Sequence, residues 1–356
     1  MRQPYRSLLD PITFYGAFGL LLFGPVAFGA TEPWSIFLLE AGSALLFLMW
    51  IIRQAQAGEV MVSSSPLFAP MLSFMALVGL QLLGGHTAYR YQTFRSALLY
   101  VAYGALAFVV VQSLRRTSQV KFLTVLFSAY GFAVASFALV QSMSSSGKLY
   151  WLRTPRSGGW IYGPYVNHNH YAGLMEMLAP VPLVFALSRY AHGPRRTMAA
   201  IAAAIMASTI FLSGSRGGMV AFAVQMAALA GILVRRRKSK RLALVSGAFL
   251  VISVGLLAWL GGGELTKRMA SIRTEARAEL SGGTRLEITR DGLKMFTRKP
   301  VVGWGMGVFP DVYPEFRSFY SDLFVNAAHD DYLQLLMEMG GLGFIVMLWL
   351  DRKSVV

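Results

Sequence analysis

Residues 97–113 have the sequence ALLYVAYGALAFVVVQS, a stretch of 17 residues without a charged side chain. A helix of about 17 to 25 mostly apolar residues is long enough to cross a hydrocarbon core of about 30 Å. Comparable apolar runs recur along most of the chain, and they lack the alternation of apolar and polar residues that marks the strands of a membrane barrel. The pattern therefore predicts an all-α fold, a polytopic bundle of transmembrane helices.

About ten such helices are expected, and the first should be retained because no small-residue cleavage site follows it. Their predicted ranges are 11–30, 34–52, 66–84, 97–113, 119–141, 169–188, 197–213, 217–234, 242–261 and 331–350. We divide the chain accordingly into N-terminal transmembrane helices (1–145), transmembrane helices with polar motifs at their outer ends (146–261), a large and partly helical non-cytoplasmic loop (262–328), a final transmembrane helix (329–350) and a short tail (351–356).

The composition supports a membrane protein and excludes several kinds of site. Hydrophobic residues make up 55% of the 356 residues and charged residues 14%, whereas soluble domains have about 25% charged residues. The absence of cysteine excludes disulfides, thiolate nucleophiles and cysteine metal sites. His168 and His170 are the only histidines close in sequence, and no carboxylate lies near them. We therefore expect neither a metal nor a cofactor.

The distribution of basic residues predicts that the N-terminus is cytoplasmic. Cytoplasmic loops near helix ends are rich in Lys and Arg, and with this orientation every inside connection is basic, from Arg53 to the run in residues 235–241. The net charge of +16 then reflects contact with anionic lipid head groups rather than with nucleic acid. Long loops do not follow this rule, so the many bases of the outside loop 262–328 need another explanation.

The first polar cluster, GPYVNHNHYAG at residues 163–173, lies where an outside loop enters the sixth helix. Asn167 and His168 could cap the helix by satisfying its first N–H groups, or they could bind a ligand. For Asn169 and His170 we favour a ligand role, because both side chains can donate hydrogen bonds to phosphate or sugar oxygens.

The second cluster, LSGSRGG at residues 212–218, forms a very short turn between the seventh and eighth helices. Its glycines permit a tight reversal. Arg216 could extend toward lipid head groups. Alternatively, its guanidinium could bind an anion together with the hydroxyls of Ser213 and Ser215 and the N–H groups of a helix end, an arrangement that suits phosphate.

The third cluster spans the large outside loop and the start of the last helix. Residues 285–299 predict an amphipathic helix with Leu286, Leu293 and Phe296 near one face, ended by Pro300. A Gly-rich turn follows at 300–309, and His329-Asp330-Asp331 opens the last helix.

Two carboxylates fall within predicted transmembrane helices, Glu176 in the sixth and Glu338 in the tenth. A buried charge is costly in a membrane, so each should face a partner or a polar interior. Either could be a structural partner for an arginine or part of the functional site.

Taken together, these stretches resemble the O-antigen ligase family of polytopic membrane proteins. The match extends over residues 150–343 and is most specific at His329, which is followed by a polar residue, nine further residues and Gly-x-x-Gly at 340–343. The family usually has Asn, Ser or Gln where this chain has Asp330. Neither Arg285 nor Arg290 has the leucine four residues later that the family pattern contains, and Arg285 is the better candidate by its place before the Pro-Gly turn.

The resemblance implies a metal-independent, inverting glycosyltransferase that moves a glycan from a polyprenyl diphosphate carrier to an acceptor hydroxyl at the outer face of the bacterial inner membrane. It implies that Arg216 and Arg285 stabilise the leaving diphosphate, and that His329 is the general base, since imidazole titrates near neutral pH. Asp330 or Asp331 could orient the imidazole ring. The substrate-binding residues would be Asn167, Asn169, His170, Ser213, Ser215, Arg290 and Asp330.

Alternative functions are a glycan polymerase and a protein O-oligosaccharyltransferase. A solute or anion transporter is a further alternative, but transporters have broken helices with polar residues near the bilayer midplane, and here the charge gathers at one face. A structural scaffold would leave the three clusters unexplained.

The C-terminus also departs from the family, whose members typically have about twelve helices. We therefore expect the chain to be truncated. Residues 351–356, DRKSVV, could be translated from a sequencing-adapter sequence, which makes them a candidate non-native tail.

Overall fold

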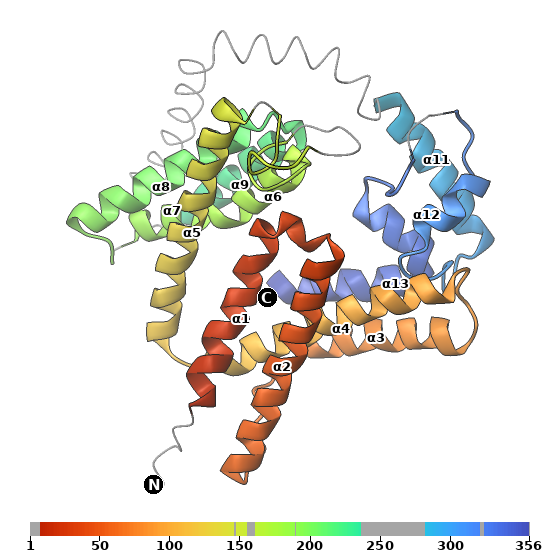
Figure 1. The fold of residues 1–356 in the computed structure, drawn as a ribbon, viewed down its shortest axis with the longest axis horizontal. Coiled ribbons are helices and arrows are strands. Elements are labelled where there is room, and N and C mark those ends of the chain that lie inside the picture. Colours follow the sequence, from red (N-terminus) through yellow and green to blue (C-terminus); the bar gives the residue numbers. More distant parts are fainter. Residues whose placement is uncertain are drawn as a thin grey trace. The chain divides into compact units, whose positions relative to one another are not determined.

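The computed structural model describes residues 8–145, 147–154, 161–188, 190–235, 282–320 and 324–355. Within these ranges the secondary structure is helical, apart from two isolated β-bridges (Figure 1). Seven helical stretches in the described part are long and apolar enough to cross a bilayer, and two shorter apolar helices accompany them. The predicted all-α polytopic fold is thereby confirmed.

Contacts between residues divide the chain into two compact units. The first unit draws on the ranges Met1–Leu21, Pro33–Leu114 and Leu280–Val356, and the second on Leu22–Glu32 and Arg115–Glu279. The first unit thus combines the N-terminal helices with the C-terminal ones.

The first unit contains most of α1 together with helical segments from both ends of the chain. These are α1 (Leu9–Val26), α2 (Pro33–Ala57), α3 (Phe68–Leu83), α4 (Arg90–Ser113), α11 (Gly282–Arg298), α12 (Phe309–Val312), the 3-10 turn η2 (Tyr313–Glu315) and α13 (Asp331–Val355). Helix α2 packs on α4, and α3 packs on both α4 and α13. Helix α11 packs on the N-terminal part of α13, and side chains of both helices share a core with α12.

The second unit contains the last residues of α1, a short 3-10 turn η1 (Phe28–Ala30) and five helices. These are α5 (Thr117–Ser144), α6 (His168–Leu178), α7 (Pro180–Leu187), α8 (Gly193–Leu212) and α9 (Arg216–Arg235). Helix α8 contacts each of the other four. Their core includes Tyr171, Met175, Met206 and Phe222, none of which exposes appreciable surface.

Nine of the ten predicted transmembrane helices coincide with helices of the structure, and the remaining one, 242–261, lies outside the described residues. Helix α4 begins at Arg90 rather than at residue 97, so Arg90 and Arg95 belong to the helix and not to the preceding loop. The predicted single helix 169–188 is two helices that meet at Ala179. Pro180 opens the second of these, consistent with the preference of proline for a first helical turn.

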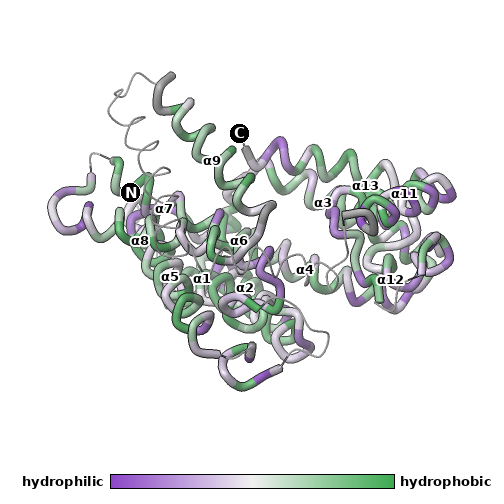
Figure 2. Tube along the Cα trace, turned by 90° about the horizontal axis from the view of Figure 1, so that it is seen from above, coloured by the Kyte–Doolittle hydropathy of each residue, from purple (hydrophilic) through white to green (hydrophobic). Residues whose placement is uncertain are grey.

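The outward faces of the long helices are apolar, as expected for side chains in contact with lipid. Phe37 and Leu45 of α2 and Val125 of α5 are largely exposed, although all are apolar. Figure 2 shows hydrophobic residues along helices such as α5 and α8, and more hydrophilic residues around α11 and α12.

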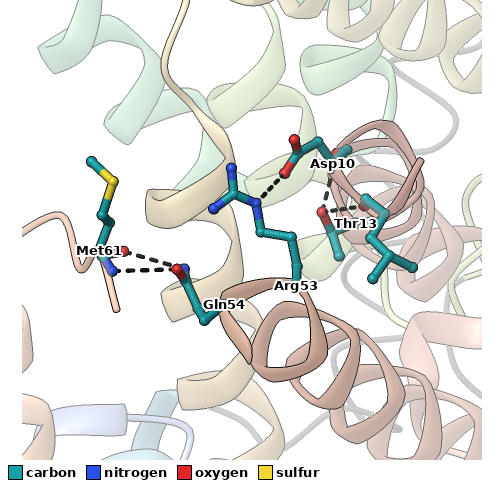
Figure 3. Close-up of polar contacts among 6 residues, drawn as sticks. Asp10, Thr13, Arg53, Gln54 and Met61 are labelled. Atoms are coloured by element: carbon teal, nitrogen blue, oxygen red, sulfur yellow. Dashed lines mark hydrogen bonds and ion pairs between the residues drawn. The ribbon is translucent and has the colours of Figure 1, made fainter. Parts of the chain in front are cut away.

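Polar contacts fasten the predicted cytoplasmic ends of α1 and α2 to each other and to the loop that follows (Figure 3). Arg53 donates from Nε to Asp10 Oδ1 at 2.9 Å. The Gln54 amide exchanges two hydrogen bonds with the backbone of Met61. Arg53, one of the bases used to predict the orientation, therefore also has a structural partner.

The amphipathic helix predicted at 285–299 is α11, but of its predicted apolar face only Phe296 packs against the core. Leu286 and Leu293 are exposed, whereas Ile288, Gly292 and Met295 are buried. Asp291 is buried on the same side and accepts hydrogen bonds from Lys294 Nζ and from the backbone and hydroxyl of Ser318. These bonds compensate for the burial of a carboxylate on the core side of the helix.

Candidate functional site

Asn167 caps the N-terminus of α6. The helix begins at His168, and Asn167, in an extended conformation, accepts a hydrogen bond of 2.8 Å from Asn169 N to its Oδ1. This is the arrangement expected of an N-cap. The capping interpretation of Asn167 thus describes its contact in the structure, while the adjoining His168, the first residue of the helix, is buried.

Ser213 and Ser215 organise the turn between α8 and α9. The Ser213 hydroxyl donates to Ile210 O at 2.6 Å. The Ser215 hydroxyl accepts from Gly218 N at 3.1 Å and so caps α9. Both serines are buried, and Gly214 between them has φ +76°, which glycine adopts without strain.

The first two polar clusters lie together. Ser215 Oγ donates a hydrogen bond of 2.7 Å to Asn169 Oδ1, which joins the first turn of α6 to the cap of α9. The close approach depends on Gly218, where a Cβ would lie 2.7 Å from Ala172 Cβ and 2.9 Å from Glu176 Oε1. The two helix N-termini are therefore neighbours, and each has the partial positive charge that attracts anions.

Arg216 is the first residue of α9, so its backbone stands at this pair of helix starts. His170 is exposed on the first turn of α6, with its ring centroid 6.4 Å from that of Tyr165. Burial, aided by the nearby Tyr150, raises the pKa of Tyr165 to about 12.

In the first unit, Arg285 and Arg290 lie on different faces of α11. Spacings of three and four residues put Arg285 in line with Ile288, Gly292 and Met295, the buried residues of the helix. Arg290 is two positions after Ile288 and is therefore directed to the opposite side. Both arginines are exposed, but only Arg285 continues the face that packs against α13.

Helix α11 and the first part of α13 run in the same direction, which brings Arg285 and His329 to the same end of the pair. The loop after α11 meets the middle of α13, where Gly341 N donates to Pro300 O at 2.8 Å. Earlier in α11, a Cβ on Gly292 would lie 2.8 Å from Met337 Sδ and 3.5 Å from Leu333 Cδ2. Following this register further, the start of α11 lies near the start of α13.

His329 is exposed and directly precedes the N-cap of α13. Its φ of +58° is in the left-handed region, which is uncommon for a side chain other than glycine although histidine tolerates it better than most. Asp330 Oδ1 accepts from Leu333 N at 3.0 Å. The polar residue after the histidine is thus a helix cap, a contact that Asn or Ser can also make.

The Gly-rich turn after α11 packs tightly against α3, α4 and α13. Gly303, Gly305 and Gly307 all have positive φ, and added Cβ atoms would collide with Glu338, Thr87 and Ser96 respectively. Gly340, the first glycine of Gly-x-x-Gly, also has positive φ, and its Cβ would collide with Val301 O. Both the Gly-rich turn and the Gly-x-x-Gly motif therefore need glycine where the turn packs against α13.

Glu338 accepts hydrogen bonds from the backbone of this turn. Its carboxylate accepts from Gly307 N at 2.7 Å, from Phe309 N at 3.1 Å and from Gln334 Nε2 at 3.2 Å. Gln81 of α3 bonds the same region through Val302 O, Glu338 O and Met306 N. Within the described residues, no three His, Asp or Glu side chains form a group that could hold a metal ion.

A comparison with known protein families identified a match to the C-terminal part of the chain. Residues 201–348 match the family model described as O-antigen ligase. The resemblance to the O-antigen ligase family is confirmed. Neither the curated proteins nor the solved structures gave a match.

The O-antigen ligase match contains seven of the predicted site residues. They are Ser213, Ser215, Arg216, Arg285, Arg290, His329 and Asp330. Asn167, Asn169 and His170 precede the matched range, although the Asn169–Ser215 hydrogen bond joins their motif to it. The matched region is typical of a glycosyl-transferring membrane enzyme, and the chain has an O-antigen ligase-like membrane function.

Sequence reasoning missed the contributions of Gln81 and Gln334 to this region. Gln334 is four residues before Glu338 and five after His329, so helical spacing could have indicated a pairing with Glu338. No local pattern connects Gln81 to Val302, which is 221 residues away.

Proposed function

We propose that this chain is a membrane glycosyltransferase that moves a glycan from a polyprenyl diphosphate carrier to an acceptor hydroxyl, as in lipopolysaccharide or surface polysaccharide assembly. The supporting observation is that Arg285 and His329, on two segments of the matched region, lie at the same end of the parallel pair formed by α11 and the first part of α13. A cation and a base are the two groups that such a transfer requires.

The neighbouring starts of α6 and α9 support an anionic donor. The Asn169–Ser215 bond uses the amide oxygen of Asn169, which leaves its two N–H groups as donors for a phosphate or sugar oxygen. Arg216 begins α9 beside this contact. His170, exposed on the same turn of α6, would add a further donor.

In the proposed reaction, the acceptor oxygen attacks the anomeric carbon of the donor from the side opposite the diphosphate. The new C–O bond forms as the bond to the phosphate oxygen breaks, and the electron pair leaves with the diphosphate. His329 receives the proton of the acceptor hydroxyl. Arg216 and Arg285 stabilise the negative charge that develops on the leaving group, and each such preorganised donor is worth about 2.7 to 4 kcal/mol. The configuration inverts in this single displacement.

The test is transfer by the purified full chain in liposomes that contain a labelled lipid-linked oligosaccharide. Wild-type protein should move the label to an added acceptor, and His329→Ala should abolish transfer while retaining binding of the carrier lipid. Arg298→Ala is a matched control, because Arg298 is an exposed arginine in the last turn of α11, away from Arg285. Full activity of His329→Ala, or no transfer by the wild type, would contradict the proposal.

The same experiment separates the three reactions that share this chemistry. Product on lipid A core identifies a ligase, product on a pilin-like protein identifies a protein O-oligosaccharyltransferase, and longer lipid-linked chains without added acceptor identify a polymerase. We propose the ligase-type reaction.

The proposed location is the bacterial inner membrane, with a cytoplasmic N-terminus and the reaction at the periplasmic face. Because the chain has no cysteine, a single introduced cysteine reports one position. Ala88→Cys, in the loop before α4, should react with an impermeant maleimide from outside. Glu59→Cys, in the loop after α2, should react only after permeabilisation. Both positions are exposed, and the opposite labelling pattern would overturn the orientation.

A further inference from the structure

His329 has a backbone conformation that requires support from its surroundings. The left-handed region is unfavourable for residues other than glycine, and His329, at φ +58°, is exposed and outside the helix that follows. Such an outlier persists only where neighbouring contacts fix it.

The residues on both sides of His329 are bonded to the first two turns of α13. Ala328 N donates to Gln334 Oε1 at 3.0 Å. Asp330 accepts twice, through its carboxylate from Leu333 N at 3.0 Å and through its carbonyl from Gln334 N at 2.9 Å. Gln334 therefore contacts the chain both before and after His329.

The orientation of the Gln334 amide is set by Glu338. The backbone N–H of Ala328 can only donate a hydrogen bond, and the oxygens of Glu338 are the acceptors for the N–H groups of Gly307 and Phe309. Gln334 must therefore direct Nε2 to Glu338 Oε1, at 3.2 Å, and Oε1 to Ala328 N. Glu338 is itself held by the N–H groups of Gly307 and Phe309, so the series of bonds continues from the His329 segment to the Gly-rich turn.

We propose that Gln334, held by Glu338, is a positioning residue that keeps His329 in place to accept the proton of the acceptor hydroxyl. This inference rests on the proposed function, and it adds that the Gly-rich turn and the histidine are coupled through these two side chains. Glutamine is suited to position 334 because the side chain there must accept a hydrogen bond from Ala328 and donate one to Glu338.

The experiment measures kcat and KM of the full chain in liposomes, together with thermal unfolding of the same preparations. Gln334→Ala should lower kcat about 100-fold, the cost that a misplacement of about 1 Å can have, with little change in the KM of the donor. Gln112→Ala is the control for a purely structural loss. Gln112, near the C-terminal end of α4, also accepts one hydrogen bond and donates another through its amide, here to the backbone of Ser63 in the loop between α2 and α3. Its loss should lower stability without lowering kcat.

An exchange of the two side chains separates positioning from packing. Gln334→Glu alone sets two carboxylates against each other, and Glu338→Gln alone sets an amide N–H group against the N–H groups of the turn. Both should lower kcat. In the double variant, the carboxylate at position 334 accepts from the amide at position 338, which restores the bond between these two side chains but not the bond from Phe309 N. The kcat should therefore recover in part relative to each single variant.

The outcomes distinguish this inference from the proposed function. If the wild type transfers glycan, His329→Ala does not and Gln334→Ala retains wild-type kcat, then the positioning inference is wrong and the proposed function stands. A loss of kcat in Gln334→Ala matched by Gln112→Ala, with no recovery in the double variant, would also overturn the inference. If the wild type does not transfer glycan, the proposed function itself fails.

Discussion

The Ser215 hydroxyl donates a 2.7 Å hydrogen bond to the amide oxygen of Asn169, 46 residues earlier in the chain. The same hydroxyl accepts from Gly218 N at the start of α9. One serine therefore caps one helix and orients the amide of another. As a result, the amide oxygen of Asn169 is held by Ser215, and its amide nitrogen retains two N–H groups that can donate hydrogen bonds.

Asn169→Asp should separate the structural contact from ligand binding. Aspartate retains an oxygen that accepts from Ser215, so the thermal unfolding temperature should stay near that of the wild type. It replaces the N–H donors by a second oxygen that repels phosphate. Hydrogen bonds to charged groups are worth about 1.5 to 3 kcal/mol, so the KM of the lipid-linked donor should rise by about tenfold to 100-fold. Asn169→Ala should alter both stability and KM, and an unchanged KM in both variants would remove Asn169 from the binding site.

Arg285→Ala should lower kcat more than Arg290→Ala, because the two arginines lie on different faces of α11. Loss of a preorganised cation at the leaving group should reduce kcat by about 10² to 10³-fold. Arg285→Lys should recover part of this loss, since lysine retains the charge but not the two-pronged geometry of arginine. Arg290→Ala should mainly raise the KM of the donor. Rates measured under saturating donor give the two kcat values. Equal losses of kcat in Arg285→Ala and Arg290→Ala would contradict a role that depends on the face of α11.

The helices were predictable because apolar runs of membrane length are a strong local signal. The caps were also accessible from sequence, since Asn167, Ser215 and Asp330 are residue types that bond the first N–H groups of a helix. The prediction for Asn167 included this interpretation, whereas Ser215 and Asp330 were assigned only to the substrate.

The buried face of α11 was not predictable in the same way. Leu286 and Leu293 have the apolar spacing of a core face, and yet Asp291 is buried in their place. Burial of this carboxylate depends on Ser318, 27 residues away, and no local pattern indicates that bond. The same holds for Gln81, whose partners Val302 and Glu338 are far later in the chain.

Gly340→Ala should destabilise the protein more than an equivalent change elsewhere in the same unit. Gly340 has φ +65°, and a Cβ would collide with Val301 O, so both backbone strain and steric overlap oppose alanine. We expect a loss of about 1 to 3 kcal/mol from the strained conformation alone. Gly79→Ala in α3 is the control, because no atom lies within 4 Å of its added Cβ and alanine favours a helix. Thermal unfolding in detergent compares the two, and equal unfolding temperatures would contradict the contact between the glycine motifs.

The stability of the α11 region should decrease at acid pH through Asp291. Burial alone would raise the pKa of this carboxyl, but hydrogen bonds from Lys294 and Ser318 favour the charged form and lower the pKa below its usual value. A group whose pKa is lower in the folded state stabilises the protein above its unfolded pKa, about 3.9, and this contribution is lost as the pH falls through the folded pKa. Asp291→Asn removes the titration and should be less stable than the wild type at about pH 7, because charge-assisted bonds are lost.

Thermal unfolding temperatures measured in detergent provide the test. The gap between the unfolding temperatures of the wild type and Asp291→Asn should narrow as the pH is lowered from about 7 toward about 3. Glu287→Gln provides the control, since Glu287 is an exposed carboxylate on the same helix, and it should behave as the wild type over this range. A constant difference between Asp291→Asn and the wild type would show that the Asp291 side chain acts through its shape and not through its charge.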